Sequence, residues 1–70
     1  MTQHQIQQLQ EQFLGKRIAF KDSKGELFIG DCQFIGYNTF IPEWGFQVTI
    51  DRLPVRHVNP STIKLYEEKR

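Results

Sequence analysis

The chain has a single cysteine, Cys32, so it cannot form a disulfide within itself. The two histidines, His4 and His57, together with Cys32 are too few and too badly spaced for a closed zinc site. The 70 residues therefore lack both covalent and metal staples. A domain of this size buries only about 60% of the surface that its unfolded chain exposes. We expect one domain over residues 1–70 that gains further support by forming a homo-oligomer.

The sequence also lacks an excess of charge and any long apolar run. Nine basic and eight acidic residues give a formal net charge of +1, so no overall field draws the protein to duplex DNA or to an anionic membrane. No stretch approaches the roughly 20 apolar residues of a membrane span, and the polar N-terminus is unlike a secretory signal. With a free cysteine, these features predict a cytoplasmic protein that does not bind membranes.

A helix is predicted for residues 2–14. Thr2 and Gln5 have the spacing of a capping box, and Gly15 is a typical residue at which a helix ends. The other face of this segment is rich in glutamine, which indicates either a solvated surface or a contact surface. Apolar residues recur at helical spacing and form one stripe: Ile6, Leu9 and Phe13.

From residue 16 onward the apolar residues alternate with polar ones, as in half-buried strands. The second strand is long and contains Gly30 and Gly36, which indicate a sharp bend or bulge. Residues 52–54 are expected to turn the chain into the fourth strand. Asn59 and Pro60 favour one tight helical turn before the fifth. The expected strands span residues 16–21, 26–37, 46–51, 55–58 and 63–66.

A helix, five short strands and a helical turn before the last strand follow the order of small SH3-like and Sm-like barrels. We therefore predict a mostly β fold, with a five-stranded barrel over residues 16–66 after the N-terminal helix. Residues 67–70 form a charged tail.

Three aromatic residues, Tyr37, Phe40 and Trp44, lie in or beside the loop of residues 38–45. Aromatic side chains anchor interfaces and also stack on unpaired bases. Three interpretations stay open at this stage. The loop caps one end of the barrel, forms a subunit or protein interface, or stacks on bases.

Basic residues are scattered, but four of them converge if the first and fourth strands are neighbours: Arg17, Lys21, Arg52 and Arg56. On the expected fourth strand His57 points to the same side as Val55, and Arg56 points to the other side. His57 is then either a structural residue or a contact to nucleic acid or a small ligand. The alternative to a shared basic patch is that the four basic side chains are scattered over the surface and simply solvated.

Nothing in the sequence indicates catalysis. Neither histidine belongs to a recognised nucleophile motif, although such groups are assembled in space. The glycines lie within or between strands and do not form a phosphate-binding loop. We predict that the protein is not an enzyme and needs no cofactor.

The segment Val55-Arg56-His57-Val58, followed by Ser61-Thr62-Ile63, resembles the end of the bacterial Sm-like riboregulators of the Hfq type. The N-terminal helix, the turn at Gly25 and the bend at Gly30 also fit the Sm-like order. This resemblance implies a ring-shaped homo-oligomer in which Arg56 and His57 help to line an RNA-binding pore.

Residues 15–63 are also similar in outline to the plasmid-borne type II dihydrofolate reductases, which are SH3-like barrels that form tetramers. That family has a Gln-Ile-Tyr run after the valine of its active-site strand. Here Val55 is followed by Arg56, His57 and Val58, so the resemblance implies the fold without the activity.

The sequence thus predicts a noncatalytic binding module that acts as a homo-oligomer on RNA or single-stranded nucleic acid. Arg56, His57, Arg17, Lys21 and Arg52 are the candidate contacts. Two alternatives remain, a protein-interaction module of the SH3-like type and an oligomeric pore that binds a small ligand.

Overall fold

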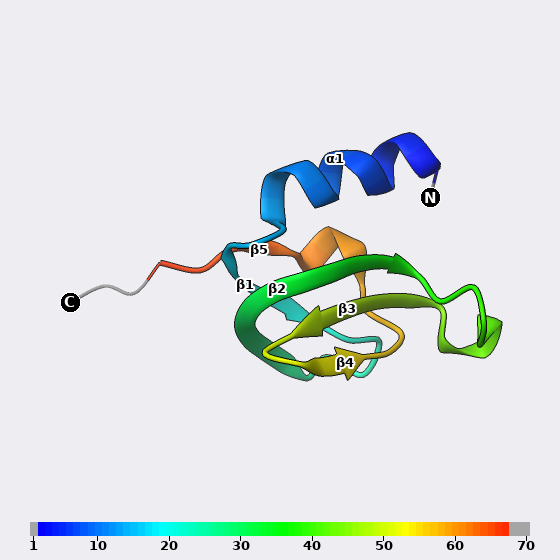
Figure 1. Ribbon diagram of the computed structural model, residues 1–70. Helices are drawn as coiled ribbons and strands as arrows, with labels where there is room; N and C mark the ends of the chain where they lie inside the picture. Colours follow the sequence, from blue (N-terminus) through cyan, green and yellow to red (C-terminus); the bar gives the residue numbers. More distant parts are fainter. Residues whose placement is uncertain (1, 68–70) are drawn as a thin grey trace.

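The computed structural model describes residues 2–67 and shows one helix lying over a curled antiparallel sheet (Figure 1). The prediction of a mostly β fold with an N-terminal helix is confirmed. Of the predicted charged tail, only Glu67 lies within the described residues. The elements are α1 (Gln3–Phe13), β1 (Arg17–Lys21), β2 (Leu27–Tyr37), β3 (Phe46–Ile50), β4 (Leu53–Val55) and β5 (Lys64–Leu65), with 3-10 turns η1 (Pro42–Trp44) and η2 (Pro60–Thr62).

The strands form one sheet in the order β4-β3-β2-β1-β5. Residues 27–31 of β2 pair with β1, and residues 32–37 pair with β3. A register shift between Cys32 and Phe34 marks the point where β2 bends from one partner to the other. Figure 1 shows β2 curving round so that its two halves belong to two facing layers. The predicted bend in the second strand is therefore confirmed.

The predicted closure into a barrel is wrong, because the edge strands β4 and β5 do not pair with each other. β4 has three residues and β5 has two, so neither is long enough to close the sheet. A single bridge between Asp22 and Val58 connects the β1–β2 turn to the chain that follows β4. The result is a curled sheet that is open along one side.

Gly30 allows the tip of the β3–β4 hairpin to approach β2. A Cβ atom at this position would lie 2.6 Å from Asp51 Oδ2 and 3.0 Å from Ile50 Cβ, so the Asp51 side chain and Ile50 would have to move to admit a side chain here. The absence of a side chain therefore permits the tight packing of the two layers at the bend.

Helix α1 begins at the predicted capping box, in which Thr2 and Gln5 exchange hydrogen bonds. Phe13 is buried in the core, and Ile6 and Leu9 pack against it, so the predicted apolar stripe is confirmed. Gln10 is half-buried, and its Nε2 donates a hydrogen bond of 2.7 Å to the Ile35 carbonyl.

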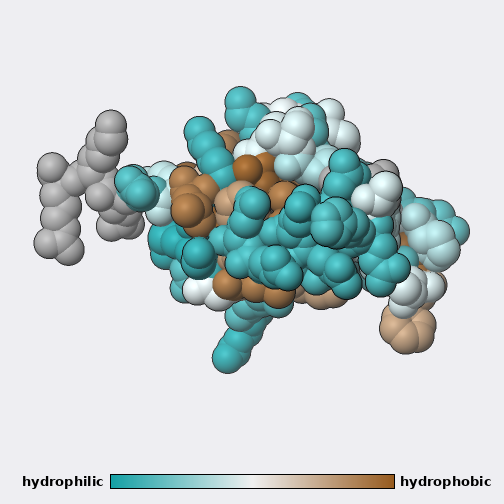
Figure 2. All heavy atoms as spheres, turned by 90° about the horizontal axis from the view of Figure 1, so that it is seen from above, coloured by the Kyte–Doolittle hydropathy of each residue, from teal (hydrophilic) through white to brown (hydrophobic). Residues whose placement is uncertain are grey.

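Seen from above, where α1 lies, the surface is mainly hydrophilic, with smaller hydrophobic areas between the polar side chains (Figure 2). Most of the glutamine face is therefore solvated, and Gln10 is the contact residue on it. Within residues 2–67, no helix has the length and apolar character that a bilayer crossing requires.

The β3–β4 turn consists of Asp51 and Arg52, which corrects the predicted turn at residues 52–54. Both residues have positive φ, at 47° and 68°, as in the tight turns that join twisted strands. Contacts from β2 hold this conformation. Asp51 Oδ1 accepts from the Asp31 amide at 3.1 Å, and the Arg52 amide donates to Gln33 Oε1 at 2.7 Å.

Pro54 was predicted to belong to a turn. In the structure it lies within the edge strand β4, opposite Thr49. Ile50 and Leu53 close the two-residue hairpin and exchange backbone hydrogen bonds. The backbone of the next residue, Pro54, therefore faces away from β3. An edge position of this kind needs no backbone donor and therefore tolerates proline.

The predicted strand over residues 55–58 is also wrong, because β4 ends at Val55. His57 has a φ of +54°, so the backbone leaves the extended conformation there. As a result His57 is exposed while Val55 and Val58 are buried, and the expected alternation fails.

Candidate functional site

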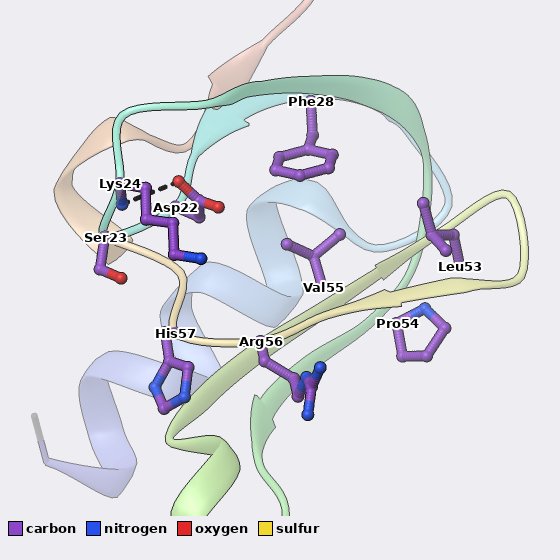
Figure 3. Close-up of a pocket in the computed structure, with 9 residues that line it drawn as sticks. All are labelled: Asp22, Ser23, Lys24, Phe28, Leu53, Pro54, Val55, Arg56 and His57. Atoms are coloured by element: carbon purple, nitrogen blue, oxygen red, sulfur yellow. Dashed lines mark hydrogen bonds between the residues drawn. The ribbon is translucent and has the colours of Figure 1, made fainter.

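A groove of about 400 Å³ lies on the open side of the sheet, between the β1–β2 turn, the start of β2 and the chain around β4 (Figure 3). Phe28 from β2 and Val55 from β4 face each other across it. Lys24, Arg56 and His57 line one end, so the groove combines an apolar floor with a basic rim. In Figure 3, Lys24 extends from the turn toward the segment that carries Arg56 and His57.

The β1–β2 turn is folded around the carboxylate of Asp22. Its Oδ1 accepts hydrogen bonds of 2.9 Å from the backbone amides of Lys24 and Glu26. Gly25, with a φ of +83°, donates its amide to the Asp22 carbonyl. These bonds hold the Asp22 carboxylate, which keeps its negative charge, against the backbone of the turn, and within the described residues it forms no ion pair with Lys24 or Arg56. The groove therefore carries one negative charge beside the positive charges of Lys24 and Arg56.

His57 is held in its left-handed conformation by backbone contacts on both sides. Its amide donates to the Trp44 carbonyl at 3.0 Å, and its carbonyl accepts from the Ser23 amide at 2.8 Å. Its ring lies over Gly45, where a Cβ atom would come within 3.3 Å of His57 Nδ1. A left-handed non-glycine residue persists only where its surroundings fix it. Here these contacts place the imidazole on the rim.

Arg56 stacks on Trp44, with its Cζ atom 5.0 Å from the ring centroid. This is the geometry of a cation–π contact. Trp44 is the last residue of η1, at the end of the 38–45 loop. The aromatic ring therefore restricts the guanidinium before any ligand arrives.

The 38–45 loop is organised by Asn38. Its Oδ1 accepts from the amides of Phe40 and Ile41 at 2.9 and 2.8 Å, and its Nδ2 donates to Gln47 Oε1. Gln47 is buried, so the start of the loop is tied to β3. This arrangement fixes the loop that carries Trp44.

The structure does not bring the four predicted cations together. β2 and β3 lie between β1 and β4, so the first and fourth strands are not neighbours. Arg17 Nη1 lies 3.7 Å from Asp31 Oδ1, and Arg52 is on the β3–β4 turn. Lys21 borders a different hollow of about 330 Å³, together with Lys64. Of the four, only Arg56 lines the groove.

The three aromatic residues have different surroundings. Tyr37 packs edge-to-face on Phe46, with the two ring centroids 5.6 Å apart, and the Trp44 ring lies under the Arg56 guanidinium. Phe40 is 94% exposed, so it does not cap an end of the sheet. Phe34, Tyr37 and Phe40 instead border an uncharged hollow of about 340 Å³.

Sequence reasoning missed Lys24 and Phe28 as groove residues. Phe28 alternates with the exposed Leu27 and Ile29, so its inward direction could have been read from the pattern. Lys24 carried no comparable signal, because a lysine in a turn is usually solvated.

Comparison of this chain with models of protein families, with curated proteins and with solved structures finds no match. The Sm-like and SH3-like resemblances therefore stay predictions. Any function has to be argued from the groove itself.

Proposed function

We propose that the protein is a noncatalytic module that binds single-stranded nucleic acid, RNA or DNA, along the basic rim of the groove. The observation that carries this proposal is the combination of Lys24, Arg56 and His57 beside Phe28 at one open groove. Single strands are typically bound by cations that contact phosphates and by aromatic or guanidinium planes on which bases stack.

Each rim residue has a distinct role in this proposal. Lys24 contributes a mobile point charge suited to a phosphate. Arg56 contributes a planar donor that Trp44 already orients, so less side-chain freedom is lost on binding. His57 contributes a ring nitrogen for a hydrogen bond to a base or sugar.

The groove offers two permanent positive charges, Lys24 and Arg56, against the negative charge of Asp22. Electrostatic affinity grows with the number of phosphates that are neutralised, so a single copy binds weakly. Two or more grooves on one assembly would raise the overall affinity without new contacts. The proposal therefore includes action as a homo-oligomer.

Arg56→Ala tests the site directly. We expect weaker binding of a fluorescently labelled oligo(U) at low salt, and a salt dependence whose log–log slope falls by about 1, because one phosphate contact is lost. Fluorescence anisotropy over a salt series measures both quantities. Arg17→Ala is the matched control, since it removes the same charge beside Asp31 and outside the groove.

Equal losses in the two variants would show that net charge, rather than the groove, binds the strand. If the wild-type protein binds neither oligo(U) nor oligo(dT) at low salt, the proposal is wrong. The uncharged hollow at Phe34, Tyr37 and Phe40 favours a second candidate, a protein-interaction module. Its binding would be insensitive to salt and to Arg56→Ala.

A further inference from the structure

The uncharged hollow lies between the end of β2, the 38–45 loop and β3, and it shares no lining residue with the basic groove. Its volume of about 340 Å³ is at the small end of the range for small-molecule sites, which is roughly 300 to 1,000 Å³. Within residues 2–67 no charged side chain lines it, so it suits a single uncharged ring system. The lining residues are Phe34, Tyr37, Asn38, Thr39, Phe40 and Gln47.

Two of its aromatic rings are exposed although their supports are fixed. The Phe40 ring is 94% exposed, yet the Phe40 amide donates to Asn38 Oδ1 at 2.9 Å, which holds the backbone beneath the ring. The Tyr37 ring is half exposed and packs edge-to-face on Phe46, which sets its orientation. Exposed apolar rings that are held in place in this way are typical of binding sites, because their faces remain free to stack.

The only buried polar side chain within residues 2–67 also lines the hollow. This side chain, Gln47, is 9% exposed. It pairs across the sheet with Gly36, which has no side chain that would cover it. The Phe34 ring lies beside Gly36, where a Cβ atom would come within 3.2 Å of Phe34 Cζ. An amide thus lies among the aromatic rings of the hollow.

This amide keeps part of its hydrogen-bonding capacity. A glutamine side chain has two N–H donors and an oxygen that accepts twice. Gln47 Oε1 accepts from Asn38 Nδ2 at 3.2 Å, and Gln47 Nε2 donates to Thr49 Oγ1 at 3.3 Å. Within the described residues, one donor and one acceptor position of Gln47 are left unused. The two bonds that are formed hold the amide in one orientation, which prepares these positions for a ligand.

We propose that the uncharged hollow binds a nucleobase, stacked on the exposed rings and hydrogen-bonded at its edge to Gln47. Unpaired bases are held by aromatic stacking together with hydrogen bonds to their edges. Glutamine amides match such edges because a base carries donors and acceptors side by side. A sugar ring has no flat conjugated face for stacking, and an apolar peptide side chain leaves the unused positions of Gln47 unpaired.

Adenosine and uridine test the site without any phosphate. In NMR spectra of the ¹⁵N-labelled protein we expect the side-chain amide signals of Gln47 and Asn38 to shift, with dissociation constants in the millimolar range. Phe40→Ala should raise these constants about fivefold or more, because a stacking ring is lost, and Phe40→Trp should not. Tyr66→Ala is the matched control, since it removes an aromatic ring that is 36% exposed outside the hollow.

Ribose and N-acetylphenylalanine amide serve as the competing probes. If neither nucleoside shifts the two amide signals, the proposal is overturned. Shifts of equal size from ribose or from the phenylalanine derivative would also overturn it, because the occupant would then be a sugar or a peptide side chain. Equal effects of Phe40→Ala and Tyr66→Ala would show that stacking in the hollow contributes nothing.

The base can belong to a free nucleoside or to a bound strand, and the second case rests on the proposed function. If Phe40→Ala weakens oligo(U) binding without changing its salt dependence, the base belongs to the strand, because no charge is removed. An unchanged oligo(U) affinity assigns the hollow to a free nucleoside. Arg56→Ala should leave the nucleoside shifts unchanged, since Arg56 does not line the hollow. Nucleoside shifts in a protein that does not bind oligo(U) would count against the proposed function alone.

Discussion

At the scale of a residue, burial controls the acid–base behaviour of Cys32. The residue is 2% exposed, and burial raises the pKa of its thiol above the ordinary value of 9.0 because the thiolate would lose its hydration. Well below pH 9.0 the folded and unfolded chains both keep the proton, so the free energy of unfolding does not change with pH through this group. As the pH rises further, the unfolded chain releases the proton first, and the free energy of unfolding falls.

We therefore expect the wild type to lose more stability than Cys32→Ala between about pH 8 and 10. Urea unfolding at each pH measures the difference, and Cys32→Ala subtracts the effect of every other titrating group. Parallel stability curves for the two proteins would contradict this prediction.

At the scale of an element, helix α1 is attached to the sheet by its apolar stripe of Ile6, Leu9 and Phe13 and by one glutamine. Gln10 Nε2 donates to the Ile35 carbonyl beside the bulge in β2. Gln10→Ala should lower the free energy of unfolding by about 1 kcal/mol, because a half-buried carbonyl loses its side-chain donor. Gln12→Ala, on an exposed position of the same helix, should change it by less than about 0.5 kcal/mol. Chemical denaturation followed by circular dichroism measures both, and equal effects would show that the hydrogen bond contributes nothing.

At the scale of the whole molecule, β2 belongs to both layers of the sheet. Neither layer can lose its structure without disturbing this shared strand, so the domain should unfold in one cooperative step. Trp44 is the only tryptophan, and it lies next to β3 at one end of the molecule. Urea transitions followed by Trp44 fluorescence and by far-ultraviolet circular dichroism should therefore coincide. Separate midpoints would show that the two layers unfold independently.

Local signals in the sequence were sufficient for most elements. The capping box at Thr2 places the start of α1, and Asn59 caps η2 as expected. Alternation locates β1, β2 and β3 to within about one residue. These elements could be predicted because the cap residues and the apolar periodicity that identify them lie within a few residues of one another in the sequence.

The candidate site depended on contacts between distant segments. The conformation of His57 is set by Trp44 and Ser23, and the β3–β4 turn is held by Asp31 and Gln33 of β2. No local pattern records such contacts, so sequence reasoning extended a strand through residue 58. The sequence by itself determined which residues are apolar, which are basic and that the chain turns near Gly25. Only the tertiary structure decided that Arg56 stacks on Trp44, and that the sheet stays open along one side. Both results depend on how far β2 bends and on how short the edge strands are.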